Sequence, residues 1–345
     1  MDAGTPFRFL TSLLCILEGK EYILTGNERM KERPVHSLVE ALRSLGADIT
    51  YTENKGYPPL LISGTKLVGR SIEVDGSVSS QFISSLCLLA PRIEKGLDIE
   101  ITKHIVSDSY LQMTLDMMME FGILYERNIN HVRIPPQRYL AKRFCVENDW
   151  SSATFFYTMA MLMDDVGLFL PGLQQQSIQG DSIITEIAAD FGVESTFGKD
   201  GCFLKKIGST DTSFTKEYDL SSYPDLAVPF IVVCAIRYPS VTITGIHHLE
   251  LKESKRISAL QEEFKKVGLH LLYDGHTARF RQDPQWTKQK EITLNCYDDH
   301  RLVMAFSMLA LCGYTVHLEN SDCVGKSFPD FFGQIGSIGF TSASE

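Results

Sequence analysis

The sequence predicts an α/β protein of two domains, built from repeated units of about 74 residues. Three observations support this prediction. The chain has 345 residues, of which 44% are hydrophobic, enough to fill two cores. Five segments share one pattern, in which a turn with a small or acidic residue leads into an apolar helix. Short β-branched runs lie between the helices, as is typical of strands.

The first repeated pattern marks the start of a helix. Its five copies begin 73, 74, 75 and 74 residues apart, at Asp2, Asp75, Asp149, Pro224 and Asp298. In the first copy, either Thr5 or Asp2 is expected to cap the helix, and Pro6 is expected in its first turn. Because a turn of this kind normally follows a strand, a further segment is expected before the first residue.

A second helix in each unit ends at a glycine, which favours the left-handed conformation that closes a helix. These glycines are 76, 70, 76 and 71 residues apart, at Gly46, Gly122, Gly192, Gly268 and Gly339. Strands are predicted at EYILTG, PPLLISG, SIEVDG, DIEIT, HVRIPP, SVTITG and EITLNC. Each unit therefore reads helix, strand, helix, strand, strand. Two independent markers that keep nearly one period argue against coincidence among ordinary αβ segments.

Composition excludes several functional classes. The net charge of −10 disfavours nucleic acid and anionic membranes as partners. The longest apolar run, VPFIVVCAI, is shorter than the roughly 18 residues of a membrane helix, and the N-terminus shows no signal-peptide pattern, so a cytoplasmic protein is expected. The eight cysteines contain no CxxC pair, which favours reduced thiols. No set of residues with metal-ligand spacing is found, and no metal is expected.

Charged and polar residues recur at the turns that precede helices. GNERMKERP carries Arg29, LKESKR carries Lys252, Glu253 and Arg256, and CVGKSFPD carries Lys326. Further polar positions in such turns are Gly4, Arg8, Arg33, Ser79, Ser80, Gln81, Asp149, Asp225, Asp299, His300 and Arg301. Helix N-termini direct backbone N–H groups at anions. The pattern predicts a site for a ligand with several negative charges.

In order and spacing, the motifs of the whole chain resemble those of the 5-enolpyruvylshikimate-3-phosphate synthase family. The matching motifs are GTPFRFL, GNERMKERP, DGSVSSQF, DWSSA, YPDLA, LKESKR, YDDHR and CVGKSFPDFF. The resemblance implies the enolpyruvyl transferase fold, an inside-out α/β barrel with two domains of three units and an active site in the cleft between them. It assigns residues 1–147 to the first domain and 148–345 to the second. Five of the six units are then present, with the first unit expected before Met1 and the last one short of its closing strands.

The family's reaction transfers the enolpyruvyl group of phosphoenolpyruvate to the 5-hydroxyl of shikimate 3-phosphate and releases phosphate, in the biosynthesis of aromatic amino acids. It uses no metal or organic cofactor, and a monomer is expected. The resemblance places phosphoenolpyruvate at Gly4, Arg29, Gln81, Arg256, Arg301 and Lys326. It places shikimate 3-phosphate at Ser79, Ser80, Gln81, Ser107, Asp225, His248 and Lys252. His248 stands where the family often has asparagine. Asp225 and Glu253 are the candidates for the two proton transfers, and which acts at which step stays open.

Three alternatives accompany this reading. The arginines could instead form structural ion pairs with Glu28, Glu253 or Asp299, and Ser79 or Ser80 could simply cap a helix. The related transfer to UDP-N-acetylglucosamine is disfavoured by SSQF, YDDHR and CVGKSFPD. The chain could also be a noncatalytic remnant. Loss of one unit would expose roughly 1,000 Å² of apolar surface, on the order of 25 kcal/mol, against a net stability of about 5–15 kcal/mol. Negligible turnover of the chain alone is therefore expected.

Overall fold

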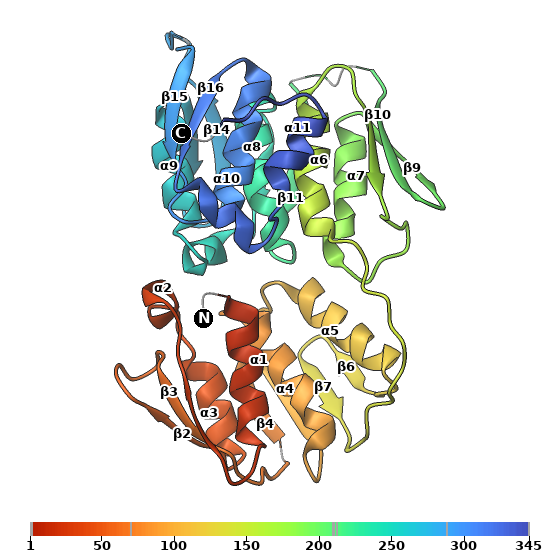
Figure 1. Cartoon of the computed structure of the whole chain (residues 1–345), viewed down its shortest axis with the longest axis vertical. Helices are drawn as coiled ribbons and strands as arrows, with labels where there is room; N and C mark the ends of the chain where they lie inside the picture. Colours follow the sequence, from red (N-terminus) through yellow and green to blue (C-terminus); the bar gives the residue numbers. More distant parts are fainter. Residues whose placement is uncertain (1–2, 70, 209–210, 212, 288, 344–345) are drawn as a thin grey trace. The chain divides into compact units, whose positions relative to one another are not determined.

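The computed structural model describes residues 3–69, 71–208, 211, 213–287 and 289–343. The chain divides into two units between Cys145 and Val146 (Figure 1). The division lies two residues before the expected boundary at 147/148. The assignment of repeat units to each domain stays a prediction.

The first unit contains two sheets and a group of packed helices. Its helices and 3₁₀ turn are α1 (Gly4–Cys15), α2 (Glu28–Lys31), α3 (His36–Ser44), α4 (Ser80–Leu89), η1 (Ala90–Arg92) and α5 (Asp108–Glu120). Its strands are β1 (Glu21–Leu24), β2 (Asp48–Tyr51), β3 (Leu60–Ser63), β4 (Ser71–Asp75), β5 (Leu97–Thr102), β6 (Glu126–Asn128) and β7 (His131–Ile134). One sheet has the order β1-β3-β2 and is antiparallel. The other has the order β4-β5-β7-β6, in which β4 and β5 are parallel.

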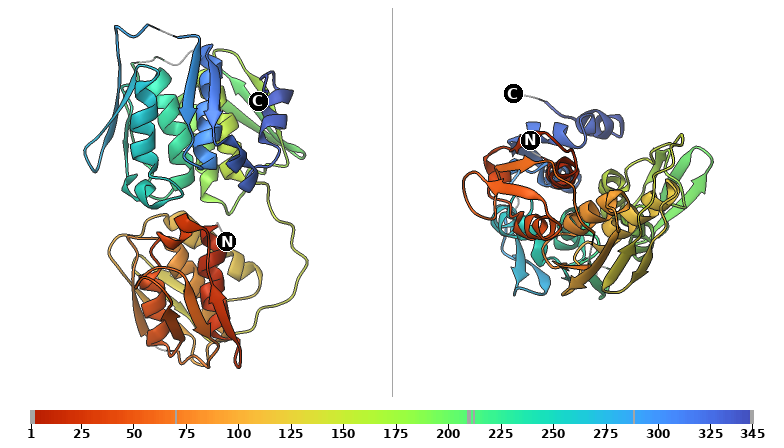
Figure 2. Two further views of the ribbon diagram at one scale, coloured as in Figure 1. Left: turned by 60° about the vertical axis from the view of Figure 1, so that its left-hand side comes forward. Right: turned by 90° about the horizontal axis from the view of Figure 1, so that it is seen from below.

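The helices of the first unit form its core. Helix α4 contacts α1, α3 and α5, and its residues from Phe82 to Cys87 are all buried. A helix that is buried all round belongs inside a domain. Figure 2 shows the helices side by side with the sheets on their outside. The first turns of α1 and α4 lie together, because the Gln81 side chain donates to Thr5.

The second unit follows the same scheme. Its helices and 3₁₀ turns are α6 (Trp150–Leu162), η2 (Gly180–Ile183), α7 (Ile184–Asp190), α8 (Pro224–Arg237), η3 (His247–Leu251), α9 (Arg256–Lys265), α10 (His300–Ser307), η4 (Met308–Cys312), η5 (Ser321–Lys326) and α11 (Phe331–Ser337). Its strands are β8 (Gly167–Pro171), β9 (Val193–Gly198), β10 (Gly201–Lys206), β11 (Glu217–Asp219), β12 (Thr242–Thr244), β13 (Leu269–Tyr273), β14 (Ala278–Gln282), β15 (Glu291–Asn295) and β16 (Thr315–Glu319).

Three sheets cover the helices of the second unit. Their strand orders are β8-β10-β9, β11-β12-β14-β13 and β15-β16, and the pairs β11–β12 and β15–β16 are parallel. Helix α8 is the central helix, because it contacts α6 and α10 and all residues from Leu226 to Ala235 are buried. Its apolar sequence, VPFIVVCAI, is explained by this position inside the unit rather than by a membrane.

The predicted elements and their order are found in both units. The seven β-branched runs lie in strands β1, β3, β4, β5, β7, β12 and β15. The five predicted closing glycines all have positive φ, between 68° and 106°. The cap predicted for the first helix is wrong at Thr5, because Thr5 is the second residue of α1 and Ala3 is its N-cap. Pro6 lies in the first turn as predicted, and Asp2 lies outside the described residues.

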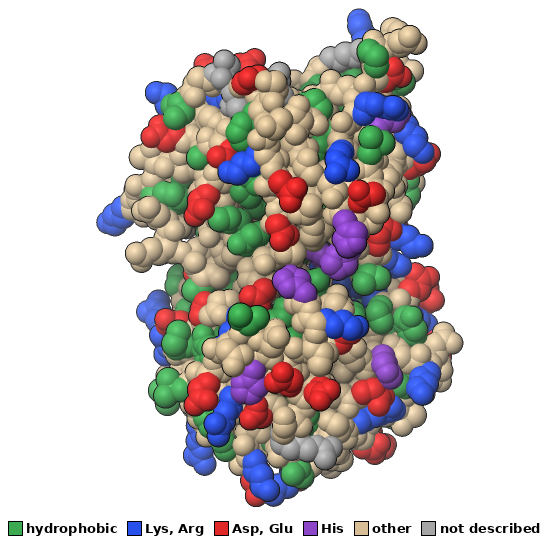
Figure 3. Space-filling model, turned by 180° about the vertical axis from the view of Figure 1, so that it is seen from behind, with side chains coloured by type: hydrophobic (Ala, Val, Ile, Leu, Met, Phe, Trp, Pro, Cys, Tyr) green, Lys and Arg blue, Asp and Glu red, His purple; other side chains and the backbone are tan. Residues whose placement is uncertain are grey.

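The surface carries charged side chains of both signs, and the helices are short or polar, as the composition of the sequence indicates. On the face shown in Figure 3, cationic and anionic side chains are interspersed over both units. Among the helices that the structure describes, none is both long and apolar enough to cross a membrane.

Candidate active site

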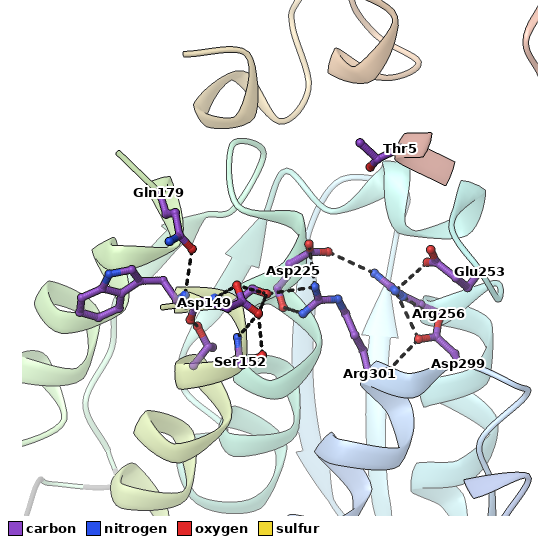
Figure 4. A network of polar contacts seen from close by, with 12 residues as sticks. Thr5, Asp149, Ser152, Gln179, Asp225, Glu253, Arg256, Asp299 and Arg301 are labelled. Carbon is purple, nitrogen blue, oxygen red and sulfur yellow. Dashed lines mark hydrogen bonds and ion pairs between the residues drawn. The ribbon is translucent and has the colours of Figure 1, made fainter. Parts of the chain in front are cut away.

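In the second unit, charged residues gather at the starts of three helices, α8, α9 and α10, of which α8 and α10 pack together. Asp225 is the second residue of α8, Arg256 is the first residue of α9, and Arg301 is the second residue of α10. Figure 4 shows these side chains directed toward one another, together with Glu253 and Asp299. Because successive units place their helices alike, motifs that are distant in the sequence meet at one point. We call Asp225, Glu253, Arg256, Asp299 and Arg301 the arginine network.

Arg256 lies at the centre of the arginine network and is only 1% exposed. Its Nε donates to Asp299 Oδ2 over 2.8 Å, and its Nη2 donates to Glu253 Oε2 over 2.8 Å. The remaining nitrogen, Nη1, is buried 3.7 Å from Asp225 Oδ1 and has no hydrogen-bond acceptor among the described residues. A buried guanidinium nitrogen without an acceptor is costly, so this atom is suited to an oxygen of an anionic ligand.

Arg301 is joined to Arg256 through Asp225. Its Nη2 lies 2.7 Å from Asp225 Oδ2 and 3.4 Å from the hydroxyl of Ser151, and its Nη1 donates to the backbone oxygen of Asp225. Asp299 caps α10 by accepting from the Arg301 amide over 3.0 Å. Arg256 forms the ion pairs that the alternative reading expected, with Glu253 and Asp299, whereas Arg301 pairs with Asp225. The ion pairs orient both guanidinium groups, and among the described residues Arg256 Nη1 has an ion-pair partner but no hydrogen-bond acceptor.

The charges of the network control the protonation of its carboxylates. Burial raises the pKa of Asp225, but Arg301, Lys252 and Arg256 lower it more, so that the pKa lies below its usual value. Burial likewise raises the pKa of Asp299, and Arg256 outweighs this effect. Both carboxyl groups are therefore ionised at neutral pH, and Asp225 is in the form that a proton acceptor requires.

His248 and Lys252 occupy the segment that precedes α9. His248 lies in η3, is 2% exposed, and neither ring nitrogen has a hydrogen-bond partner among the described residues. Burial, followed by the charge of Lys252, lowers the pKa of His248 to about 3, so the imidazole is neutral. Lys252 directly follows η3. Lys326 is exposed at the last residue of η5, which packs against α10.

The first unit provides a second group of predicted site residues, also at helix starts. Ser79 caps α4 by accepting from the Gln81 amide over 3.3 Å, and the Gln81 side chain donates to Thr5 Oγ1 over 2.8 Å. Ser80 is buried in the same turn. Ser107 precedes α5 in a left-handed conformation and its side chain does not cap that helix. Helices α1 and α4 are therefore connected at the ends that carry these polar residues.

Gly4 borders two buried arginines. A Cβ atom at Gly4 would lie 2.8 Å from Nη1 of both Arg8 and Arg33, so a larger residue there would displace the ends of the two arginine side chains. Arg8 also donates to the Gly4 carbonyl over 3.1 Å. Neither arginine was assigned a ligand from the sequence, and their recurrence at helix starts was the only available signal. Arg29 is less buried and pairs with Glu32 over 2.9 Å, whereas Glu28 pairs with Lys31.

Metal ligands are not gathered in the described part of the chain, where His, Cys, Asp and Glu form no group of three or more that could hold an ion. The described cysteines are free thiols, most of them buried.

The arrangement of helices and sheets defines the class of protein, which is the class with the enolpyruvyl transferase fold. The model of the family "EPSP synthase (3-phosphoshikimate 1-carboxyvinyltransferase)" matches residues 1–335, and the chain belongs to this family. The chain is 38% identical over 342 residues to the 3-phosphoshikimate 1-carboxyvinyltransferase of Bacteroides fragilis, covering 99% of this chain and 82% of that protein. The Haemophilus ducreyi enzyme of the same name is 36% identical over 344 residues, covering 98% and 77%.

Solved structures show the same fold. The EPSP synthase of Acinetobacter baumannii superposes with a TM-score of 0.74 at 21% identity, covering all of this chain and 79% of that one. The enolpyruvyl transferase NikO of Streptomyces tendae gives a TM-score of 0.64 at 12% identity, covering 93% and 73%. The predictions of family and fold are confirmed.

Proposed function

We propose that this chain transfers the enolpyruvyl group of phosphoenolpyruvate to the 5-hydroxyl of shikimate 3-phosphate, releasing phosphate. The observation that carries the proposal is the arginine network, in which the family motifs YPDLA, LKESKR and YDDHR meet. Phosphoenolpyruvate carries a carboxylate and a phosphate, both of which match planar guanidinium groups. Arg256 and Arg301 bind it from the second unit, with Lys326 from the same unit.

The first unit supplies the remaining contacts in this proposal. Gly4, Arg29 and Gln81 contact phosphoenolpyruvate, and we add Arg8 and Arg33 as the groups that give the start of α1 its positive charge. Shikimate 3-phosphate takes the serine turns at Ser79, Ser80 and Ser107, with Gln81, Asp225, His248 and Lys252.

The two carboxylates carry the proton transfers. Asp225 is ionised and can accept the proton of the 5-hydroxyl group while the oxygen of that hydroxyl attacks C2 of phosphoenolpyruvate. Glu253 accepts a hydrogen bond from Arg256 in the free protein. The negative charge of bound phosphoenolpyruvate competes with Glu253 for Arg256 and so favours the protonated form of the Glu253 carboxyl group. A protonated Glu253 can act as the acid that donates a proton to the methylene carbon. Phosphate then leaves from the tetrahedral adduct as the methyl group formed at the former methylene carbon returns a proton to the Glu253 carboxylate. This step re-forms the double bond, and the cations stabilise the departing charge.

Phosphate release tests this function. The chain is incubated with phosphoenolpyruvate and shikimate 3-phosphate, alone and with the N-terminal segment of a longer relative added in trans. Phosphate release that requires both substrates is expected in at least one of the two arms. The arm without the segment tests the prediction that the chain alone has negligible turnover. UDP-N-acetylglucosamine in place of shikimate 3-phosphate is expected to give none. A folded chain that releases no phosphate in both arms would be a noncatalytic protein and would contradict the proposal.

A further inference from the structure

The turn between β15 and α10 has an unusual backbone. Tyr297 and Asp298 have φ angles of 51° and 53°, so two successive residues other than glycine are left-handed. Such residues are uncommon, and two in a row persist only where surrounding contacts hold them. The turn matters for the site because it leads directly into Asp299 and Arg301 of the arginine network.

A buried carboxylate holds this turn from the neighbouring helix. The Tyr297 hydroxyl donates to Glu263 Oε1 over 2.9 Å. Glu263 lies on α9, is 1% exposed, and its Oε2 accepts from the Asn295 amide over 3.0 Å and from Lys266 Nζ over 2.7 Å. Both carboxylate oxygens are therefore engaged, and Glu263 anchors the end of β15 and the tyrosine together.

The same helix holds the turn at a second point. Arg256 and Glu263 are seven residues apart on α9, which is two helical turns, so both side chains face the same way. Arg256 binds Asp299 and Glu263 binds Tyr297. The left-handed residues at 297 and 298 are thus held between two contacts to one helix. A change at Tyr297 can reach Arg256 and Arg301 through Asp299, which bonds to both (Figure 4).

We propose that Tyr297 is a positioning residue for the arginine network: its hydroxyl, bound to Glu263, fixes the turn so that Asp299 presents Arg256 and Arg301 to an anionic substrate. The identity of that substrate rests on the proposed function, whereas the coupling from Tyr297 to Arg301 does not. Tyr297 was not among the site residues that the sequence predicted.

The first test measures this coupling in the full chain without substrate. Tyr297→Phe removes only the hydroxyl. Tyr273→Phe is the matched control, because its hydroxyl donates to the Gly275 carbonyl in the β13–β14 turn of the same unit. Hydrogen exchange of the Arg301 amide, which bonds to Asp299, is expected to be about fivefold faster in Tyr297→Phe and unchanged in the control. Unchanged exchange in Tyr297→Phe would overturn the proposal.

The second test measures kinetics in the active form of the protein. Tyr297→Phe is expected to raise the KM for phosphoenolpyruvate about fivefold and to leave the KM for shikimate 3-phosphate unchanged. If Tyr297 had a merely structural role, Tyr297→Phe would lower the fraction of active protein and change neither KM. Two unchanged KM values would therefore overturn the proposal, even if exchange of the Arg301 amide were faster. If the native chain shows no turnover in any arm, the proposed function fails, and the exchange comparison still decides whether Tyr297 positions Arg301.

Discussion

At the scale of single residues, His248 makes the stability of the second unit depend on pH. Burial and Lys252 lower its pKa in the folded chain to about 3, against about 6.5 for an unfolded histidine. Below pH 6.5 the unfolded chain therefore binds a proton that the folded chain does not. The free energy of unfolding is expected to fall as the pH falls from about 6.5 toward 3, by up to about 1.4 kcal/mol per pH unit.

Urea unfolding between about pH 7 and pH 4.5 measures this dependence, because carboxylates of an unfolded chain titrate mainly below that range, near pH 4. His248→Asn is expected to reduce the slope. Part of the slope remains, because burial also lowers the pKa of His300, to about 4. His276, an exposed histidine in the β13–β14 turn, gives the matched control as His276→Asn. The same slope in His248→Asn and the native chain would contradict the assignment of a neutral buried imidazole.

At the scale of elements, one buried lysine connects the ends of two helices. Lys206 of β10 donates from Nζ to the carbonyls of Phe191 over 2.7 Å and Met161 over 3.3 Å, at the C-terminal ends of α7 and α6. The last carbonyls of a helix lack partners within it and carry partial negative charge. Lys206→Met is expected to lower the free energy of unfolding by about 1–3 kcal/mol, because the Phe191 carbonyl loses its donor and the Met161 carbonyl keeps only the Tyr238 hydroxyl.

The adjacent lysine provides the control for this prediction. Lys205 is exposed on the opposite face of β10, so Lys205→Met removes the same charge without uncovering a helix end. A change within about 0.5 kcal/mol is expected there. Urea unfolding of both variants makes the comparison, and equal losses would show that Lys206 contributes only its charge.

The sequence predicted elements better than side-chain directions. Closing glycines such as Gly268 were found because a left-handed helix end has a strong residue preference. The position of Arg256 at a helix start followed from its motif. In contrast, the packing of Arg8 and Arg33 around Gly4 depends on side-chain rotamers and on two turns that meet only in the folded unit. Tyr297 was missed for the same reason, since its partner on α9 is distant in sequence.

At the scale of the whole molecule, the hydrophobic core is divided in the same way as the chain. The buried cluster of the first unit runs from Phe7 to Ile134, and that of the second runs from Trp150 to Ile335. Residues 137–149, all of them described, form neither helix nor strand. The arginine network lies entirely within the second unit. Each unit therefore has a hydrophobic core of its own.

We expect a protein consisting of residues 146–345 to fold and to unfold cooperatively on heating, with a transition that matches one of two in the full chain. Asp299→Asn tests the match. It breaks a fully buried ion pair with Arg256, at a cost of about 3–5 kcal/mol, and lowers the midpoint of a unit of this size by roughly 10 °C. The same shift is expected in the fragment and in one transition of the full chain only, by calorimetry. A fragment without a transition, or a variant that moves both transitions equally, would show that the second unit depends on the first for its stability.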